Sequence, residues 1–251
     1  MEKKSLQIRI ADLGIRIFYR YEYMKSQCQE WLDISGAAAN IEVEASEDEI
    51  EKEYRAFPKG TVTRELCESV CIYREIAKRL IRYSAFVMHG AVVELDGKAY
   101  VFAAKSGVGK TTHTKLWLEC FPGRASYING DKPILRYREG QWYAYGTPWM
   151  GKENFGAPKS APVRAICFLE RGKGNEIHKI QDREVVNRLF HQLYLPNAKE
   201  SMLRFMDLVD EMVRAIPFYV LQCTISEEAV KTAYEGMTGD GDANAGSTEN
   251  Q

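Results

Sequence analysis

A run of small and basic residues near the middle of the chain has the composition of a phosphate-binding loop. In the pattern Gly-x4-Gly-Lys-Ser/Thr, backbone N–H groups surround phosphate oxygens, the lysine reaches the β- and γ-phosphates, and the hydroxyl ligates Mg²⁺. Residues 104–112 fit this pattern except at its first glycine, where Ala104 stands. The sequence contains no Asn-Lys-x-Asp motif, so nothing in it argues specifically for a guanine nucleotide. We predict that ATP with Mg²⁺ binds through Ser106, Gly107, Val108, Gly109, Lys110, Thr111 and Thr112.

Two further residues have side chains suited to phosphoryl transfer. His89-Gly90 precedes the loop, and Asp131 follows a short apolar run after it. Phosphoryl transfer needs positioning, charge neutralisation and a carboxylate near the incoming hydroxyl. A histidine can donate to a phosphate oxygen or carry a proton near neutral pH. We predict catalytic roles for Asp131, His89 and Lys110, and metal ligation by Thr111 and Asp131.

The hydrophobic pattern predicts the elements that hold these residues. Residues 91–95 and 98–103 form two apolar runs separated by Asp96-Gly97, which is a strong hairpin signal. The loop directly follows the second run, and a helix is expected from the loop to about Cys120. We therefore predict an α/β protein with some α+β character: a P-loop core on a mixed sheet with a hairpin before the loop, and a small N-terminal α+β part.

The remaining elements follow from the same periodicities. Phe57-Pro58-Lys59-Gly60 breaks the pattern and separates residues 1–60 from a kinase-like domain at 61–237. We expect strands at 6–19 with a turn at Gly14, and at 41–44, 126–128, 133–137, 142–145, 163–170 and 218–221. We expect helices after a Ser46–Glu49 capping box, at 63–82, 183–193 and 200–214, and after a second capping box at Thr224. The tail at 238–251 has no large apolar residue, so disorder is expected there.

The order of these motifs resembles a known family. His89-Gly90, the hairpin, residues 106–112 and Gly130-Asp131 resemble the catalytic domain of HPr kinase/phosphorylase and, more distantly, the nucleotide core of phosphoenolpyruvate carboxykinase. The resemblance covers roughly residues 85–170. It implies that His89 lies beside the transferring phosphate, that Asp131 takes the proton of an accepting serine, and that Thr111 ligates Mg²⁺.

The resemblance breaks at two places. Lys132 replaces the second aspartate of the family's pair, which puts in doubt a second metal and the reverse phosphorolysis. The segment Gly146–Asn154 lies where the family's second signature is expected, with different residues, so the acceptor can differ from HPr. The implied function is transfer of the γ-phosphoryl group to a hydroxyl, Ser or Thr, of a small protein or peptide, with residues 1–60 as a candidate acceptor-recognition part. Relatives of this group also modify ribosomally made peptides, and others use small molecules.

Composition limits the other functions. Among 251 residues, Lys plus Arg is 34 and Asp plus Glu is 35, so the net charge of −1 gives no general attraction to nucleic acid or an anionic membrane. We found no apolar run long enough for a signal peptide or a membrane span. The six cysteines form no CxxC pair, which disfavours zinc and favours reduced thiols in the cytoplasm. Whether the protein forms a homo-oligomer stays open.

Several alternatives remain at this stage. Asp131 could position Mg²⁺ in an ATPase or only form a turn, His89 could be a capped histidine at a strand edge, and Lys152 could bind phosphate or face solvent. His113 is expected to be a surface or packing residue. The aromatic residues Trp142, Tyr143, Tyr145 and Trp149 are expected to pack in the core or the sheet, with stacking on adenine or holding a peptide as the alternative. The competing functions are a nucleotide-binding regulatory protein with little turnover and a small carboxykinase-like decarboxylase, for which the chain is short.

Overall fold

The computed structural model describes residues 4–105, 107–196 and 198–239, and a mixed sheet forms its centre. The sheet follows the order β4-β8-β9-β10-β6-β5-β7, and β12 joins it beside β10 with β11 outside β12. Its strands are β4 Ala85–Val87, β5 Ala91–Leu95, β6 Lys98–Ala103, β7 Ala125–Asn129, β8 Ile134–Arg138, β9 Gln141–Tyr145, β10 Ser160–Arg171, β11 Glu176–Ile180 and β12 Phe218–Cys223. Strand β10 pairs parallel with β6 and β12 but antiparallel with β9. The predicted mixed α/β fold is confirmed.

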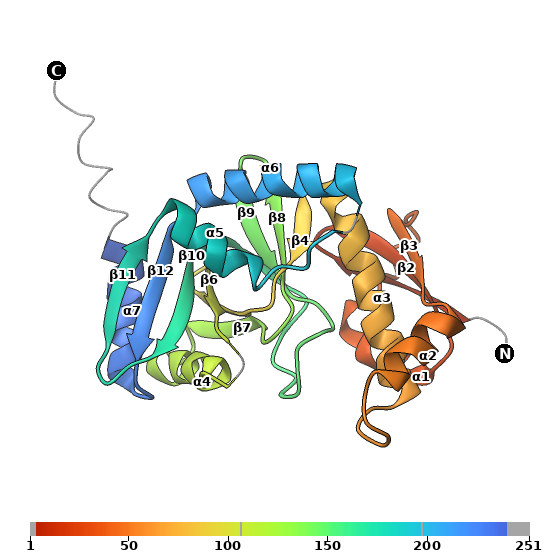
Figure 1. Cartoon of the computed structure of the whole chain (residues 1–251), viewed down its shortest axis with the longest axis horizontal. Helices are drawn as coiled ribbons and strands as arrows, with labels where there is room; N and C mark the ends of the chain where they lie inside the picture. The colour runs from red at the N-terminus through yellow and green to blue at the C-terminus, as the bar shows by residue number, and fades with distance from the viewer. Residues whose placement is uncertain (1–3, 106, 197, 240–251) are drawn as a thin grey trace.

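Helices cover both faces of this sheet (Figure 1). The helices are α4 Lys110–Cys120, α5 Asp182–Phe190, α6 Lys199–Ala215 and α7 Glu227–Gly239. Alternation along β5 sends Val93 to a cluster with Trp117 of α4 and Val230 of α7, whereas Val92 joins a cluster with Phe205 of α6. The sheet is therefore buried on both sides, and the loop to α4 follows the carboxyl end of β6, an interior strand between β10 and β5.

The N-terminal part has its own three-stranded sheet, in the order β1-β2-β3. Its elements are β1 Lys4–Ile10, β2 Leu13–Tyr19, α1 Glu22–Gln27, a 3₁₀ turn Gln29–Trp31, β3 Ile41–Glu44, α2 Glu47–Arg55, α3 Arg64–Leu80 and a second 3₁₀ turn Ile81–Tyr83. One hydrophobic cluster runs from Ile15 in this sheet through Ile72 of α3 to Trp149 beside the large sheet. The packing continues across Phe57–Gly60, so the division into domains at that point stays a prediction.

Most elements lie where periodicity placed them. Strands β5 and β6 pair antiparallel across the Asp96-Gly97 turn, and Ser46 and Glu49 form the expected capping box. The elements that the sequence analysis missed are α1, β4 and β11. In residues 4–105, 107–196 and 198–239, no helix combines the length and apolar character needed to cross a membrane.

Three local predictions were wrong. The first hairpin turns at Ala11 and Asp12, whose φ angles are 51° and 57°, and Gly14 lies inside β2. Aspartate tolerates the left-handed conformation, so this turn does not need glycine. The last helix begins at Glu227, with Ser226 Oγ accepting from the Ala229 N–H at 3.2 Å, in place of a cap at Thr224. That helix extends to Gly239, past the predicted start of the tail; residues 240–251 lie outside the described part of the chain.

Candidate active site

The glycine-rich loop, residues 104–109, connects β6 to the first residue of α4. Gly107 and Gly109 have φ angles of 78° and 117°, which side chains disfavour and glycine accepts. The turn is closed by the Val108 N–H donating to the Lys105 carbonyl at 3.2 Å. Arg171, at the end of β10, donates to the Gly107 carbonyl and so fixes the loop from the neighbouring strand. Ser106, predicted to bind phosphate, lies outside the described residues.

Lys110 is the first residue of α4, and its ammonium is buried. Among the described residues its Nζ has no hydrogen-bond partner, and Asp131 Oδ1 lies 4.0 Å away. Burial lowers the pKa of Lys110 to about 8, against the opposing charge of Asp131 and with a smaller contribution from Lys132. A buried cation without a bonded partner is costly unless an anion is present. The position therefore suits a phosphate oxygen.

Asp131 is held by a turn that begins at the end of β7. Asn129 Oδ1 accepts from the backbone N–H groups of Asp131 and Lys132 at 2.9 and 2.7 Å. The Asn129 amide in turn donates to Thr147 at 3.0 and 3.1 Å. Both Asn129 and Thr147 are buried, so the carboxylate points from a fixed backbone. The sequence analysis gave these two residues no role, although an Asn-Gly pair after a strand is a signal for such a turn.

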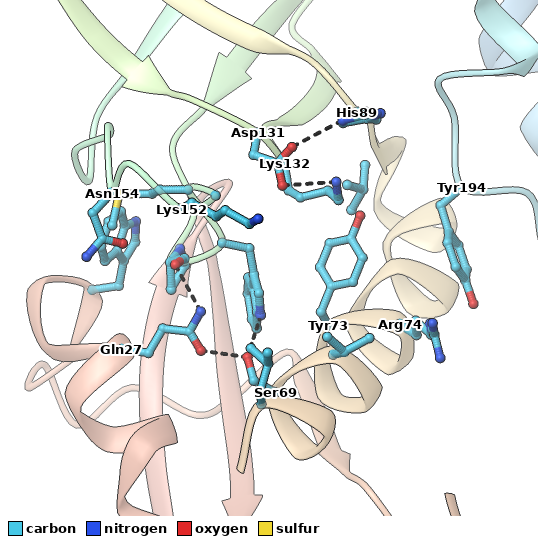
Figure 2. A pocket seen from close by; sticks show the side chains of 18 of the residues that line it. Gln27, Ser69, Tyr73, Arg74, His89, Asp131, Lys132, Lys152, Asn154 and Tyr194 are labelled. Atoms are coloured by element: carbon cyan, nitrogen blue, oxygen red, sulfur yellow. Dashed lines mark hydrogen bonds and ion pairs between the residues drawn. The ribbon is translucent and has the colours of Figure 1, made fainter. Parts of the chain in front are cut away.

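Three cationic or proton-donating groups surround the Asp131 carboxylate: the Lys110 ammonium, 4.0 Å from Oδ1, and the side chains of His89 and Lys132. His89 Nε2 lies 3.2 Å from Oδ1, and Lys132 Nζ donates to Oδ2 at 3.0 Å (Figure 2). Burial alone would raise the pKa of Asp131, but the bond with His89 and the charge of Lys132 outweigh it and hold the pKa at about 2. The structure thus brings the predicted residues His89, Lys110 and Asp131 together. Their catalytic roles stay predictions.

His89 reaches this position through the short connection between β4 and β5. Its backbone N–H donates to the Gln192 carbonyl at 2.6 Å, and the Gly90 N–H donates to the Asp131 carbonyl at 3.0 Å. A Cβ at Gly90 would lie 3.1 Å from the Phe102 carbonyl oxygen of β6. The close approach of the two backbones therefore favours glycine after the histidine, as in the sequence His89-Gly90.

Two cavities meet at these residues. The smaller, of about 450 Å³, is lined by the glycine-rich loop with Lys110, Thr111 and Thr112. The larger, of about 910 Å³, lies between the N-terminal part and the large sheet. Five residues line both cavities: His89, Asp131, Met150, Gly151 and Lys152. A group in one cavity would therefore adjoin a group in the other beside Asp131.

The residues at the smaller cavity fit a single Mg²⁺. Thr111 and Asp131 both line it, and hydroxyl and carboxylate oxygens are ligands that Mg²⁺ accepts. The described residues contain no group of three or more His, Cys, Asp or Glu side chains able to hold a metal. Mg²⁺ in nucleotide sites commonly uses one or two protein oxygens and completes its shell with phosphates and water. Such an ion would depend on the nucleotide for most of its ligands.

Comparison with known proteins identifies the family. The model of the family described as "SynChlorMet cassette protein ScmC" matches residues 62–232. The chain belongs to the ScmC family. No curated protein matches the sequence. Among solved structures, the Hpr(Ser) kinase/phosphatase from Coxiella burnetii is similar at 10% identity and a TM-score of 0.38, covering 65% of this chain and 99% of that one. The likeness is distant, and no residue role rests on it.

Four other residues singled out from the sequence of this ScmC-family protein are mostly buried: His113, Trp142, Tyr145 and Trp149. His113 is buried on α4, where its Nε2 accepts from the Trp117 indole N–H at 3.1 Å, and burial lowers its pKa to about 4. Trp142 and Tyr145 are buried in the core, as expected. Trp149 is also mostly buried but lines the larger cavity.

Lys152 is the least constrained of the five shared residues in this ScmC-family site. It stands exposed on the segment 146–154, which is the first part of the connection between β9 and β10 and reaches both cavities. Neither the phosphate-binding alternative nor the solvated one is decided for it.

Proposed function

We propose that this protein is an ATP- and Mg²⁺-dependent kinase that transfers the γ-phosphoryl group to a hydroxyl of a protein or peptide. The observation that carries the proposal is the convergence of Lys110, Asp131 and His89 where the two cavities meet. Lys110 lines the smaller cavity, and its buried ammonium has no hydrogen-bond partner within the part of the chain that the structure describes, which suits a phosphate oxygen. Asp131 faces both cavities, so it can contact a nucleotide and an acceptor together.

The transfer follows from this arrangement. The acceptor oxygen attacks the γ-phosphorus, the new O–P bond forms as the bond to the β-phosphate oxygen breaks, and ADP leaves with that electron pair. Lys110 and the loop N–H groups neutralise the phosphates, and a Mg²⁺ ion held by Thr111 and Asp131 would supply further positive charge there. Asp131 accepts the hydroxyl proton, and His89, bonded to the same carboxylate, donates to a phosphate oxygen.

The low pKa of Asp131, about 2, defines what this carboxylate can do. Such a weak base cannot remove a proton from a resting hydroxyl. In a loose phosphoryl-transfer transition state, however, the acceptor becomes acidic only as the new bond forms. Asp131 then orients the hydroxyl first and receives its proton late in the reaction. For this, Lys132 must release one carboxylate oxygen, which its 3.0 Å bond occupies in the free protein.

That same bond supports a second candidate, a nucleotide-binding regulatory protein without transfer. Both oxygens of Asp131 already have partners, His89 on Oδ1 and Lys132 on Oδ2. If Lys132 keeps its position when nucleotide binds, the carboxylate is not free to receive a hydroxyl proton. The two functions differ in whether ADP and a phosphorylated product form.

A labelling experiment separates them. The protein is incubated with γ-labelled ATP, Mg²⁺ and a cell lysate, alongside Lys110→Ala and Asp131→Asn. The kinase proposal expects labelled acceptors with the natural protein, no ATP-induced thermal shift for Lys110→Ala, and a retained shift without labelling for Asp131→Asn. Tight nucleotide binding with no ADP and no labelled product would support the regulatory function. An unchanged thermal shift in Lys110→Ala would reject the nucleotide site itself.

A further inference from the structure

The larger cavity has an apolar wall that the proposed phosphate site does not use. Aromatic and aliphatic side chains line it, among them Leu66, Val70, Tyr73, Val87, Trp149 and Tyr194. Figure 2 shows two of them, Tyr73 and Tyr194. Its volume of about 910 Å³ is near the top of the range of about 300–1,000 Å³ for ligand sites. The cavity is thus large enough to enclose an apolar group beside the reacting hydroxyl.

Several polar groups of this wall already have partners, whereas Gln192 Oε1, which also belongs to the cavity lining, has none among the described residues. The Trp149 indole N–H donates to Ser69 Oγ at 3.0 Å, Ser69 donates to Gln27 Oε1 at 2.6 Å, and the Gln27 amide donates to the Pro148 carbonyl at 3.2 Å. Arg74 forms an ion pair with Glu53, and Lys132 one with Asp131. A polar or acidic ligand gains little binding free energy from groups paired in this way, because each new hydrogen bond would replace an existing one. These paired groups leave selection mainly to shape and apolar contact, and Gln192 Oε1 can accept one hydrogen bond from a ligand, such as a peptide N–H.

The cavity connects the reaction centre with the molecular surface. His89 and Asp131 lie at one part of its lining, whereas Tyr23 and Leu66 belong to another and are 39% and 40% exposed. Large apolar side chains exposed to this extent at the rim extend the contact surface beyond the enclosed volume. A chain that enters the cavity and continues outside it would cover such a rim, whereas a fully enclosed small molecule would leave it in water.

We propose that the larger cavity binds a peptide segment in which a large apolar side chain stands within two positions of the serine or threonine that receives the phosphoryl group. The inference rests on the kinase function proposed above. The hydroxyl lies at Asp131, the apolar side chain fills the space beside Tyr73 and Trp149, and the chain leaves over Leu66. Residues of α1 and α3 thus give the N-terminal part a role in choosing the acceptor.

The test uses fluorescein-labelled nonapeptides with a central serine and one neighbouring position set to Leu, Phe, Trp or Ala. We expect kcat/KM for the apolar peptides to exceed that of the Ala peptide at least tenfold. Val70→Trp fills the cavity and should reduce this ratio toward one, whereas Glu65→Trp puts the same side chain on an exposed position of the same helix and should keep it. Leu66→Asp, at the exposed rim, provides a second variant if Val70→Trp does not fold. The ATP-induced thermal shift reports folding.

A second arm separates failure of this inference from failure of the kinase function. Binding of the same peptides with Ser replaced by Ala is measured by fluorescence anisotropy in the presence of ADP and Mg²⁺. Apolar-dependent binding without any phosphopeptide would reject the kinase function and retain the peptide site. Phosphorylation of peptides with no preference for the apolar position, or an unchanged preference in Val70→Trp and Leu66→Asp, would overturn the inference and leave the kinase function standing. Transfer only to small hydroxyl compounds, with no peptide bound, would overturn both this inference and the protein or peptide acceptor of the proposed function.

Discussion

The indole N–H of Trp149 donates a 3.0 Å hydrogen bond to Ser69 Oγ, which joins the segment beside the reaction centre to helix α3 of the N-terminal part. Ser69 passes the interaction on to Gln27 of α1. Trp149 and Ser69 are both buried, so water does not compete for the bond. A chain of hydrogen bonds from Trp149 through Ser69 to Gln27 therefore connects the two parts of the molecule at the larger cavity, within an otherwise apolar contact.

Removing the central hydroxyl should destabilise this contact. Ser69→Ala leaves the Trp149 N–H and Gln27 Oε1 without their partner in a buried place, and we expect a loss of about 1–3 kcal/mol in the free energy of unfolding. Urea denaturation measures it. In a double-mutant cycle with Trp149→Phe, the double variant should lose less stability than the sum of the two single losses, because both substitutions remove the same bond. Strict additivity would show that the bond contributes nothing of its own.

Gly146 begins the segment that reaches both cavities, and its position leaves no room for a side chain. A Cβ there would lie 1.9 Å from the Ala157 carbonyl oxygen and 2.6 Å from that of Ile128. Because both are backbone atoms, Gly146→Ala must displace the segment, and we expect a loss of about 3 kcal/mol by chemical denaturation.

Gly174→Ala is the matched control for this glycine. A Cβ at Gly174 meets no atom within 4 Å, so this variant should unfold at close to the natural denaturant midpoint. Equal stability of the two variants would mean that the close approach at Gly146 is readily relaxed.

The sequence was most informative where a local signal and the fold agree. Asp96-Gly97 predicts the hairpin that delivers the glycine-rich loop, and the apolar spacing in residues 63–82 predicts α3, which begins after Thr63 as its cap. His89 and Asp131 were both singled out, and they lie 3.2 Å apart. The order of the motifs predicts this proximity because each strand, with the connection that follows it, determines where the next polar residue lies in the fold.

The rest depended on tertiary packing. The larger cavity forms where α1 and α3 face the segment 146–154, and no local pattern encodes that separation. Strand β11 is mostly exposed and has no clear alternation, so its pairing with β12 could not be recognised. The Asn129–Thr147 contact joins residues far apart in the chain, and only the folded sheet brings them together.

The buried ammonium of Lys110 should make the nucleotide-free protein less stable than a variant with an apolar side chain at this position. Lys110→Met replaces a buried charge that has no hydrogen-bond partner among the described residues with an apolar chain of similar length. We expect a gain of about 1–3 kcal/mol in the free energy of unfolding at neutral pH. The same variant should lose the ATP-induced thermal shift. Urea denaturation and differential scanning fluorimetry measure the two effects. A destabilised Lys110→Met would indicate that Asp131, 4.0 Å away, already compensates the charge.

Nucleotide binding should take up a proton at mildly alkaline pH. Burial holds the pKa of Lys110 at about 8 in the free protein, so about half of the molecules carry the proton at pH 8 and fewer do above it. Phosphate oxygens favour the ammonium form and raise this pKa, so ADP binding should take up about half a proton at pH 8 and approach one at pH 9. Calorimetry in buffers of different ionisation enthalpy measures the number.

The control for proton uptake is Lys110→Arg, because a guanidinium stays protonated throughout this range. If this variant still binds ADP, its binding enthalpy should not depend on the buffer at pH 8 or 9. An identical buffer dependence in both proteins would assign the proton to another group.

Lys132 should control the ionisation of Asp131. The pKa of Asp131 is about 2 because the bond with His89 and the charge of Lys132 overcome the effect of burial, which acts in the opposite direction. A lowered pKa contributes stability above the unfolded value of about 3.9, and this contribution is lost as the pH falls from there through about 2. Lys132→Ala removes one of the two opposing groups, so burial then raises the pKa and the carboxyl should titrate at a higher pH than in the natural protein. A carboxyl-carbon NMR titration, with the Asp131 signal assigned by Asp131→Asn, follows this directly.

Lys132→Arg tests whether charge is the cause of that shift. An arginine retains the positive charge beside Asp131 Oδ2, so the carboxyl should titrate as low as in the natural protein. If Lys132→Ala leaves the titration unchanged, His89 alone holds the carboxylate ionised. The bond to Lys132 would then have no effect on the basicity of Asp131. Lys132 could move away from Oδ2 and make room for an acceptor hydroxyl without changing the proton affinity of the Asp131 carboxylate. If both variants raise the pKa equally, the geometry of the 3.0 Å ammonium bond, and not charge alone, sets the low value.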